Sequence, residues 1–289
     1  MNIYYKKIFS SENSNVEKIT IKLIIDTMGG LLKNFRIIFF LALFILTACS
    51  KHEIMITAHR GSSGAAPENT MSAYLLAIKM GADYAELDVQ ETSDDVLILY
   101  HDKTYKRTAG VEANVWDLPY KSIKEFDVGS WKNESYKGEP IPLFTDIIDS
   151  VNGRMLLNVE IKMNGHQDGL TENVVRVLEE KDFIDKCIVT SFDFNAINKV
   201  RKINPNIVVG YVFSKMPKNI DVFSADVDLL SVKNKVVTPE FVKRAHQSGK
   251  EVHVWGKVDE KEEMKRLMKL KVDNIITDYP DKWRKFLSK

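Results

Sequence analysis

The sequence predicts an α/β fold of the (β/α)8 or TIM-barrel class over residues 50–289. From Lys51 onward, short runs of β-forming residues alternate with amphipathic helical patterns. This alternation is typical of parallel strands that are joined by crossover helices. The chain has 289 residues, of which 44% are hydrophobic, and this is enough for one large domain with a buried core.

The expected elements follow one another in a regular order. Nine runs have the composition of strands, at residues 53–59, 84–90, 96–101, 154–162, 186–192, 207–213, 227–232, 250–255 and 273–278. Helical patterns cover residues 70–80, 170–181, 194–203, 239–248 and 259–270. Because a barrel of this class has eight strand positions, one of the nine strands must lie outside it.

The third strand is the one expected outside the barrel. Only a turn fits between it and the second strand, so we expect it to fold back as an antiparallel flap. With Ser93 and Asp94 as a two-residue loop, Glu86 would lie opposite His101. The segment that follows, residues 103–140, is weakly periodic and contains glycine, proline and aromatic residues. It predicts a loop-rich insertion before the barrel resumes.

Residues 1–49 are predicted to be an N-terminal extension and a signal peptide, not part of the fold. Positively charged residues precede an apolar run that is too short to span a bilayer comfortably. The run ends in Leu-Thr-Ala-Cys, which resembles a bacterial lipoprotein signal whose lipidated residue would be Cys49. Translation then begins at Met1 or at Met28. We expect an exported protein with a lipid anchor in a membrane, on the outer membrane or facing the periplasm; an ordinary signal or an uncleaved anchor helix would also export it.

The charge balance argues against nucleic acid as a partner. The chain has 41 Lys and Arg residues against 40 Asp and Glu residues, which gives a formal net charge of +1. No long-range field would therefore recruit a polyanion, and an anionic ligand must be bound locally. The two cysteines, Cys49 and Cys187, lie in unlike contexts and do not indicate a disulfide or a thiolate metal site. The sequence does not indicate an oligomeric state.

Ionisable residues gather at the carboxyl ends of the expected strands, where the active sites of such barrels lie. Positions 86 and 88 are two apart on one strand and so face the same side, as do positions 160 and 162. Their alternation with apolar residues turns them toward the barrel interior. The full set is His59, Arg60, Glu86, Asp88, His101, Glu160 and Lys162.

Three carboxylates brought together repel one another unless a hard cation lies between them. Ligation by oxygen alone favours Ca²⁺ or Mg²⁺ over zinc, so the sequence predicts one divalent cation of either kind. Arg60 and Lys162 are the donors expected for phosphate oxygens. His59 and His101, on opposite sides, would supply a general acid and a general base.

Six short motifs resemble those of the glycerophosphodiester phosphodiesterase family, in that family's order and spacing. They are HRG at 59–61, PENT at 67–70, ELD at 86–88, HD at 101–102, EIK at 160–162 and VDNIITDYP at 272–280. The resemblance covers residues 54–281. It implies a metal-dependent barrel that hydrolyses glycerophosphodiesters to glycerol 3-phosphate and an alcohol, with the two histidines as acid and base.

The resemblance also implies roles for single residues. By position, the metal ligands would be Glu86, Asp88 and Glu160, and Glu68 would be a further ligand or a partner of the ligands. Trp255 of the stretch VWGKVD is kept where the family has a tryptophan, but the asparagine expected nearby is replaced. Trp255 would stack against the glycerol carbons of the substrate, with different polar contacts beside it.

Two other functions fit the same residues. One is a different phosphodiesterase on the same barrel, which acts on phospholipid head groups as phospholipases and sphingomyelinase D-like enzymes do. The other is a non-catalytic lipoprotein that binds glycerophosphodiesters and presents them to a transporter. The PENT motif with the three carboxylates favours glycerophosphodiester hydrolysis over the activity of another phosphodiesterase. The presence of both histidines favours catalysis over binding alone.

Overall fold

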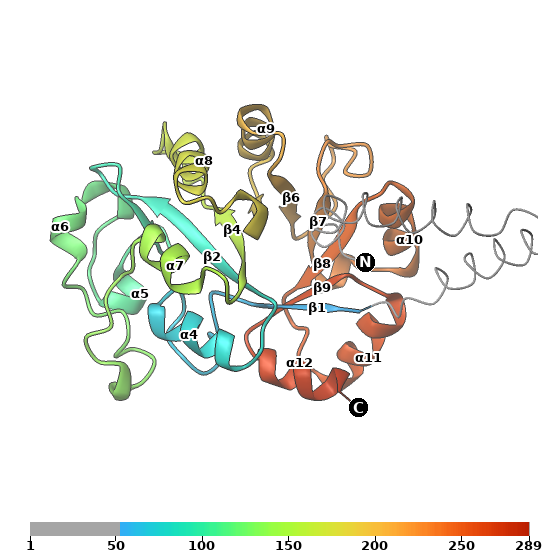
Figure 1. Ribbon diagram of the computed structural model, residues 1–289, viewed down its shortest axis with the longest axis horizontal. Coiled ribbons are helices and arrows are strands. Elements are labelled where there is room, and N and C mark those ends of the chain that lie inside the picture. The colour runs from blue at the N-terminus through green and yellow to red at the C-terminus, as the bar shows by residue number, and fades with distance from the viewer. Residues whose placement is uncertain (1–52, 289) are drawn as a thin grey trace, which may run out of the picture. The chain divides into compact units, whose positions relative to one another are not determined.

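The structure, a computed structural model, describes residues 53–288 and confirms the predicted barrel (Figure 1). Eight parallel strands run in the order β1-β9-β8-β7-β6-β5-β4-β2, and the pairing of β1 with β2 closes the ring. The ninth strand, β3 (Leu97–Leu99), pairs antiparallel with β2 outside the ring. The barrel strands are β1 (Met55–Ala58), β2 (Tyr84–Glu91), β4 (Leu156–Ile161), β5 (Cys187–Ser191), β6 (Val208–Phe213), β7 (Leu229–Lys233), β8 (Glu251–Trp255) and β9 (Asn274–Thr277).

Helices cover the outside of the barrel and bury their apolar faces against the strands. The larger helices are α4 (Met71–Lys79), α7 (Phe144–Val151), α8 (Leu170–Glu180), α9 (Phe194–Ile203), α10 (Pro239–Gln247), α11 (Lys261–Leu270) and α12 (Pro280–Leu287). Of these, α7 and α12 were not expected from the sequence. Each has only eight residues and directly follows another element or the insertion, so its hydrophobic pattern repeats too few times to be detected.

The hairpin of β2 and β3 differs from the expected register by one residue. Val89 lies opposite Leu99, so the expected pairing of Glu86 with His101 is wrong. The loop comprises residues 93–95, one more than expected, and the Thr92 amide donates to the Val96 carbonyl to close it. A residue in the left-handed region at the end of the loop accounts for the extra position, since Asp95 has a φ of 59°.

The segment between β3 and α7 forms a loop-rich lobe with short helices and a small apolar cluster of its own. The helices are α5 (Lys106–Ala109), η1 (Val115–Asp117), α6 (Tyr120–Ile123) and η2 (Glu134–Tyr136). Lys132 Nζ donates to the Ser63 carbonyl at 2.7 Å, and the Tyr136 hydroxyl donates to the Ala65 carbonyl at 3.2 Å. These bonds attach the lobe to the loop that follows β1, at the carboxyl end of the barrel.

No helix within residues 53–288 is both long and apolar enough to cross a bilayer. Cys49 and the rest of the predicted signal, residues 1–49, lie outside the described residues. Cys187, on β5, is buried and forms no disulfide.

Candidate active site

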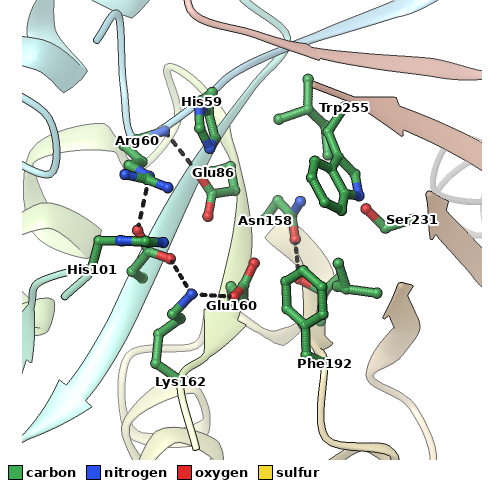
Figure 2. A pocket seen from close by; sticks show the side chains of 14 residues that line it. His59, Arg60, Glu86, His101, Asn158, Glu160, Lys162, Phe192, Ser231 and Trp255 are labelled. Atoms are coloured by element: carbon green, nitrogen blue, oxygen red, sulfur yellow. Dashed lines mark hydrogen bonds and ion pairs between the residues drawn. The ribbon is translucent and has the colours of Figure 1, made fainter. Parts of the chain in front are cut away.

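A cavity of about 120 Å³ opens at the carboxyl end of the barrel. Figure 2 shows charged side chains on one side of it, and Trp255 and Phe192 on the other. The structure brings together all seven ionisable residues that the sequence analysis expected there. The lining residues are His59, Arg60, Glu86, Asp88, His101, Asn158, Glu160, Lys162, Thr190, Phe192, Val212, Ser231, Trp255 and Ile276.

Three carboxylates form the acidic centre of this cavity. One carboxylate oxygen from each of Glu86, Asp88 and Glu160 lies within 4.8 Å of the other two. The pairing of β2 with β4 sets Asp88 beside Glu160. All three residues are buried, with exposures of 3%, 1% and 9%. Their positions on two adjacent strands follow from the strand periodicity that the sequence already shows.

The electrostatics of this centre fit a hard divalent cation. Burial, together with the charge of Asp88, raises the pKa of both Glu86 and Glu160. Burial also opposes ionisation of Asp88, but Lys162 and Arg60 outweigh it and lower the pKa of that carboxyl. Buried carboxylates that repel one another are costly without a counter-charge. Three oxygen donors of this kind suit Ca²⁺ or Mg²⁺.

Two cations lie against these carboxylates. Lys162 Nζ is 2.8 Å from Glu160 Oε1 and 3.4 Å from Asp88 Oδ1. Arg60 Nε is 3.3 Å from Asp88 Oδ2. Burial opposes the charge of Arg60 and Lys162, but the neighbouring carboxylates outweigh it and raise the pKa of both side chains. Both therefore stay charged and offer donors that match phosphate oxygens.

The turn after β1 explains why an arginine and a glycine follow His59. Arg60 has a φ of 53° and Gly61 a φ of 75°, so the chain reverses sharply at the mouth of the barrel. This turn lets the Arg60 amide donate to Glu86 Oε2 at 2.8 Å. A Cβ on Gly61 would lie 2.6 Å from that of Ala73, so glycine is required there. The strained arginine is thus held in place by the acidic centre.

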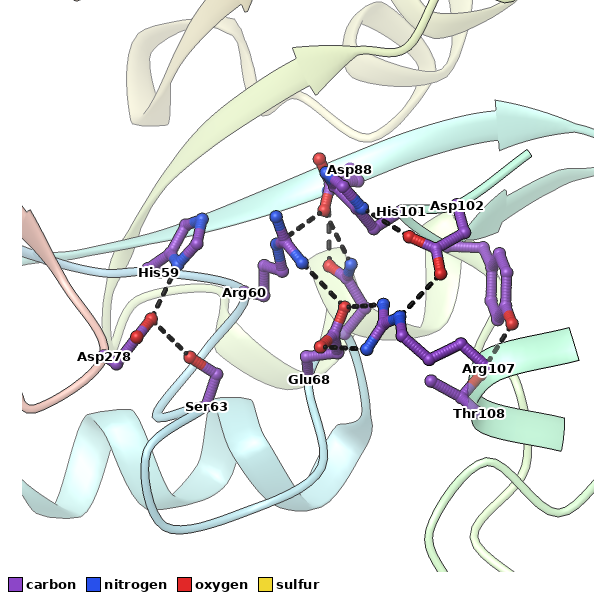
Figure 3. Close-up of polar contacts among 12 residues, drawn as sticks. His59, Arg60, Ser63, Glu68, Asp88, His101, Asp102, Arg107, Thr108 and Asp278 are labelled. Atoms are coloured by element: carbon purple, nitrogen blue, oxygen red, sulfur yellow. Dashed lines mark hydrogen bonds and ion pairs between the residues drawn. The ribbon is translucent and has the colours of Figure 1, made fainter. Parts of the chain in front are cut away.

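Each histidine of the cavity bonds a carboxylate through Nδ1 (Figure 3). His59 Nδ1 is 2.7 Å from Asp278 Oδ1, and His101 Nδ1 is 2.7 Å from Asp102 Oδ1. A carboxylate partner favours a proton on Nδ1 and leaves Nε2 for exchange with a ligand. The Ser63 hydroxyl also donates to Asp278, at 2.8 Å, and fixes that carboxylate.

The two histidines differ in proton affinity. Burial opposes the charged form of His59, but the hydrogen bond to Asp278 and the charge of Glu86 outweigh it, so the pKa of His59 is raised. Burial lowers the pKa of His101. Its acidic neighbours would raise this pKa, but the charges of Arg60 and Lys162 offset their effect. One imidazole is therefore suited to donate a proton and the other to accept one.

Glu68 does not join the three carboxylates. Its Oε1 accepts from Arg60 Nη1 at 2.7 Å and from Arg107 Nη2 at 2.7 Å. It is thus a partner of Arg60, which in turn contacts Asp88, and not a direct member of the acidic centre. Of the two roles expected for Glu68, the geometry fits the indirect one.

Several residues of the site were missed in the sequence analysis. Asp102 and Asp278 stood inside the quoted motifs HD and VDNIITDYP, but no role was given to them. Asn69 of PENT donates from Nδ2 to Asp88 Oδ2 at 2.8 Å. Arg107 could not be found from the sequence, because the insertion that contains it has no strong hydrophobic periodicity. Phe192, which directly follows β5, packs edge-on against Trp255 with ring centroids 5.8 Å apart.

Comparison with known proteins agrees with this geometry. The model of the glycerophosphoryl diester phosphodiesterase family matches residues 59–282. A glycerophosphodiester phosphodiesterase of Caldanaerobacter subterraneus is 32% identical over 236 residues, which cover 78% of this chain and 95% of that protein. A lysophospholipase D of Homo sapiens is 25% identical over 278 residues, which cover 82% of this chain and 86% of that protein.

A solved structure resembles the barrel as well. It is an Oleispira antarctica phosphodiesterase in complex with the product sn-glycerol-3-phosphate, with a TM-score of 0.76 and 27% identity. The match covers 81% of this chain and 97% of that one.

Proposed function

The chain belongs to the glycerophosphoryl diester phosphodiesterase family, and from this membership and its site we propose that it hydrolyses glycerophosphodiesters to glycerol 3-phosphate and an alcohol, with one divalent cation and two histidines. One observation carries the proposal. Both histidines, both cations and all three carboxylates line one cavity at the carboxyl end of the barrel. Such a set can bind a phosphodiester, stabilise the charge of the phosphoryl group as it transfers from an alcohol to water, and exchange the protons that this transfer needs.

The charged residues have separate tasks in this reaction. Arg60 and Lys162 bind the non-bridging phosphate oxygens. Glu86, Asp88 and Glu160 would hold Ca²⁺ or Mg²⁺, which supplies positive charge to the phosphoryl group as it transfers. Electrostatic stabilisation of this kind is usually the largest contribution to catalysis of acyl and phosphoryl transfer.

The two histidines exchange protons with the attacking oxygen and with the departing oxygen, on opposite sides of the reacting phosphorus. His101, with its lowered pKa, is neutral at neutral pH and accepts the proton of the attacking oxygen. His59, with its raised pKa, donates a proton to the oxygen of the departing alcohol. The P–O bond to the attacking oxygen forms as the P–O bond to the alcohol breaks. The attacking oxygen is that of water or of the glycerol 2-hydroxyl, which would give a cyclic phosphate first.

The apolar wall of the cavity suits the carbon part of the substrate. Trp255 lies opposite the charged residues, and Phe192 packs against it (Figure 2). We assign the face of Trp255 to the glycerol carbons. We place the alcohol part of the substrate at the open mouth of the cavity, on the solvent side.

A product assay tests this function. We expect the purified protein with Ca²⁺ or Mg²⁺ to convert glycerophosphocholine to glycerol 3-phosphate and choline, and EDTA to stop the reaction. Glycerol 3-phosphate is measured with its dehydrogenase. Lysophosphatidylcholine and sphingomyelin are tested in parallel. Choline release from these two lipids but not from glycerophosphocholine would favour the alternative phosphodiesterase function. The similarity to the human lysophospholipase D is the reason to test it. Binding of glycerophosphocholine without turnover would favour a transport-associated lipoprotein.

We further propose that the protein is exported and anchored to a membrane as a bacterial lipoprotein through Cys49. The apolar run and the Leu-Thr-Ala-Cys sequence support this proposal. A lipid anchor would place the barrel at a membrane without any apolar helix in residues 53–288. Its substrates would then be deacylated phospholipids outside the inner membrane.

Replacement of the anchor cysteine tests the location. We expect Cys49→Ser to move the protein from the membrane fraction to the soluble exported fraction, or to stall its processing, because the lipid holds it there. Fractionation followed by immunoblotting measures this, and Cys187→Ser, which changes a buried cysteine of the barrel, is the matched control. A Cys49→Ser protein that is processed normally and stays entirely with membranes would contradict the proposal.

A further inference from the structure

Arg107 connects two carboxylates that each hold a different residue of the active site (Figure 3). Its Nη1 and Nη2 donate to the two oxygens of Glu68, at 2.9 and 2.7 Å. Its Nε donates to Asp102 Oδ2 at 2.6 Å. Glu68 also accepts from Arg60, and the other oxygen of Asp102 bonds His101. One guanidinium thus lies between the partner of the phosphate-binding arginine and the partner of a histidine.

We propose that Arg107 is a positioning residue for the hydrolysis. It holds Asp102 against His101 and Glu68 against Arg60, so that the general base and the phosphate-binding arginine keep a fixed position relative to each other. The proposal rests on the function proposed above. Arg107 is not among the residues that line the cavity, and 42% of its side chain is exposed. It therefore acts through its two carboxylate partners and not by contact with substrate.

The shape of the guanidinium explains why an arginine is needed here. Its donors lie in one plane at fixed angles, so three simultaneous bonds fix the orientation of Glu68 relative to Asp102. A lysine ammonium would supply the charge but not this planar fork. Without either cation, the carboxylates of Glu68 and Asp102 would repel each other and turn away from their partners.

Two further contacts support the position of Arg107. The Thr108 hydroxyl lies 2.6 Å from that of Tyr100, which ties α5 to the residue just before His101. The guanidinium also lies over the Trp131 ring, 5.4 Å from its centroid. The lobe inserted between β3 and α7 therefore completes the active site by supplying this side chain.

Steady-state kinetics on glycerophosphocholine test the proposal. We expect Arg107→Ala to lower kcat by about 10- to 100-fold, the range typical when a partner that orients a metal ligand is lost, and to change KM by less than about threefold. Arg107→Lys should retain more activity than Arg107→Ala, and added guanidinium should raise the kcat of Arg107→Ala. The matched control is Lys106→Ala, since the neighbouring Lys106 pairs with the exposed Glu112; we expect wild-type kinetics and no response to guanidinium.

A double-variant comparison separates positioning from a general loss of structure. If Arg107 acts through Asp102, then Arg107→Ala should cost much less kcat in an Asp102→Asn background than in the wild type. Unchanged kcat in Arg107→Ala would overturn the proposal, and so would full multiplication of the two single losses with no guanidinium rescue. If Arg107→Ala does not fold, Arg107→Lys and Arg107→Gln carry the same comparison. The wild-type rate in the same assay distinguishes failure of this proposal from failure of the proposed function.

Discussion

Replacement of either cavity histidine with alanine is expected to lower kcat for glycerophosphodiester hydrolysis by about 10²- to 10⁴-fold, the usual contribution of a general acid or base. Water in the cavity cannot replace His59 or His101, because neither proton transfer then has a group of matched pKa and fixed position. Neither imidazole lies among the oxygen donors of the acidic centre, so both variants should still bind Ca²⁺ or Mg²⁺. Calorimetric titration of the metal would confirm that the site stays folded.

The pH dependence identifies which histidine is which. His101 acts when neutral, so activity rises with pH through its lowered pKa. His59 acts when protonated, so activity falls as pH rises through its raised pKa. The wild-type profile of kcat/KM should be a bell between these two values. Residual activity of His101→Ala should lack the acidic limb, and that of His59→Ala the alkaline limb.

A third histidine provides the matched control. His246 Nε2 also bonds an aspartate, Asp273, at 2.8 Å, but it lies on α10 outside the cavity. His246→Ala should therefore keep wild-type kcat and both limbs of the pH profile. Near-normal activity in His59→Ala or in His101→Ala would reject the acid–base assignment.

Removal of the divalent cation is expected to stop turnover and to lower the melting temperature. Without the cation, Glu86, Asp88 and Glu160 confront one another in a site that is almost fully buried. By linkage, a metal present at about a hundred times its Kd adds about 2.7 kcal/mol to the free energy of unfolding. Differential scanning calorimetry with EDTA, and then with excess Ca²⁺ or Mg²⁺, measures both the loss and its reversal.

A ligand variant should separate the two effects of the metal. Glu160→Gln is expected to abolish activity but to lower the melting temperature less than EDTA lowers that of the wild type, because it also removes one of the repelling charges. Its melting temperature should no longer rise with Ca²⁺ or Mg²⁺. If EDTA changes neither the melting temperature nor the rate of the wild type, and added cations raise neither, the three carboxylates are not a metal site.

Much of the site could be predicted because it depends on strand periodicity. Positions 86 and 88 had to face one side of a strand, and so did positions 160 and 162. Once the alternation of strands and helices indicated a barrel, the carboxyl ends of β1, β2 and β4 had to meet at one mouth. Arg60, Lys162 and His59 followed from their places at these strand ends, and His101 from its place at the end of the predicted flap.

The contacts that adjust this site could not be predicted in the same way. His59 and Asp278 are 219 positions apart, so their hydrogen bond exists only once β1 lies beside β9. Arg107 lies in a segment without periodicity, and nothing local indicates that it meets Glu68, 39 residues earlier.

The sequence by itself determined the barrel class and the set of side chains directed to its mouth, because hydrophobic periodicity and residue type are local properties of the chain. Only the tertiary structure decided the hairpin register, the arginine contacts of Glu68 and the aspartate partner of His59. The register depended on the single left-handed residue Asp95. The bonds between Glu68 and Arg107 and between His59 and Asp278 depended on long-range packing, which selects one among several charged partners that local sequence leaves equivalent.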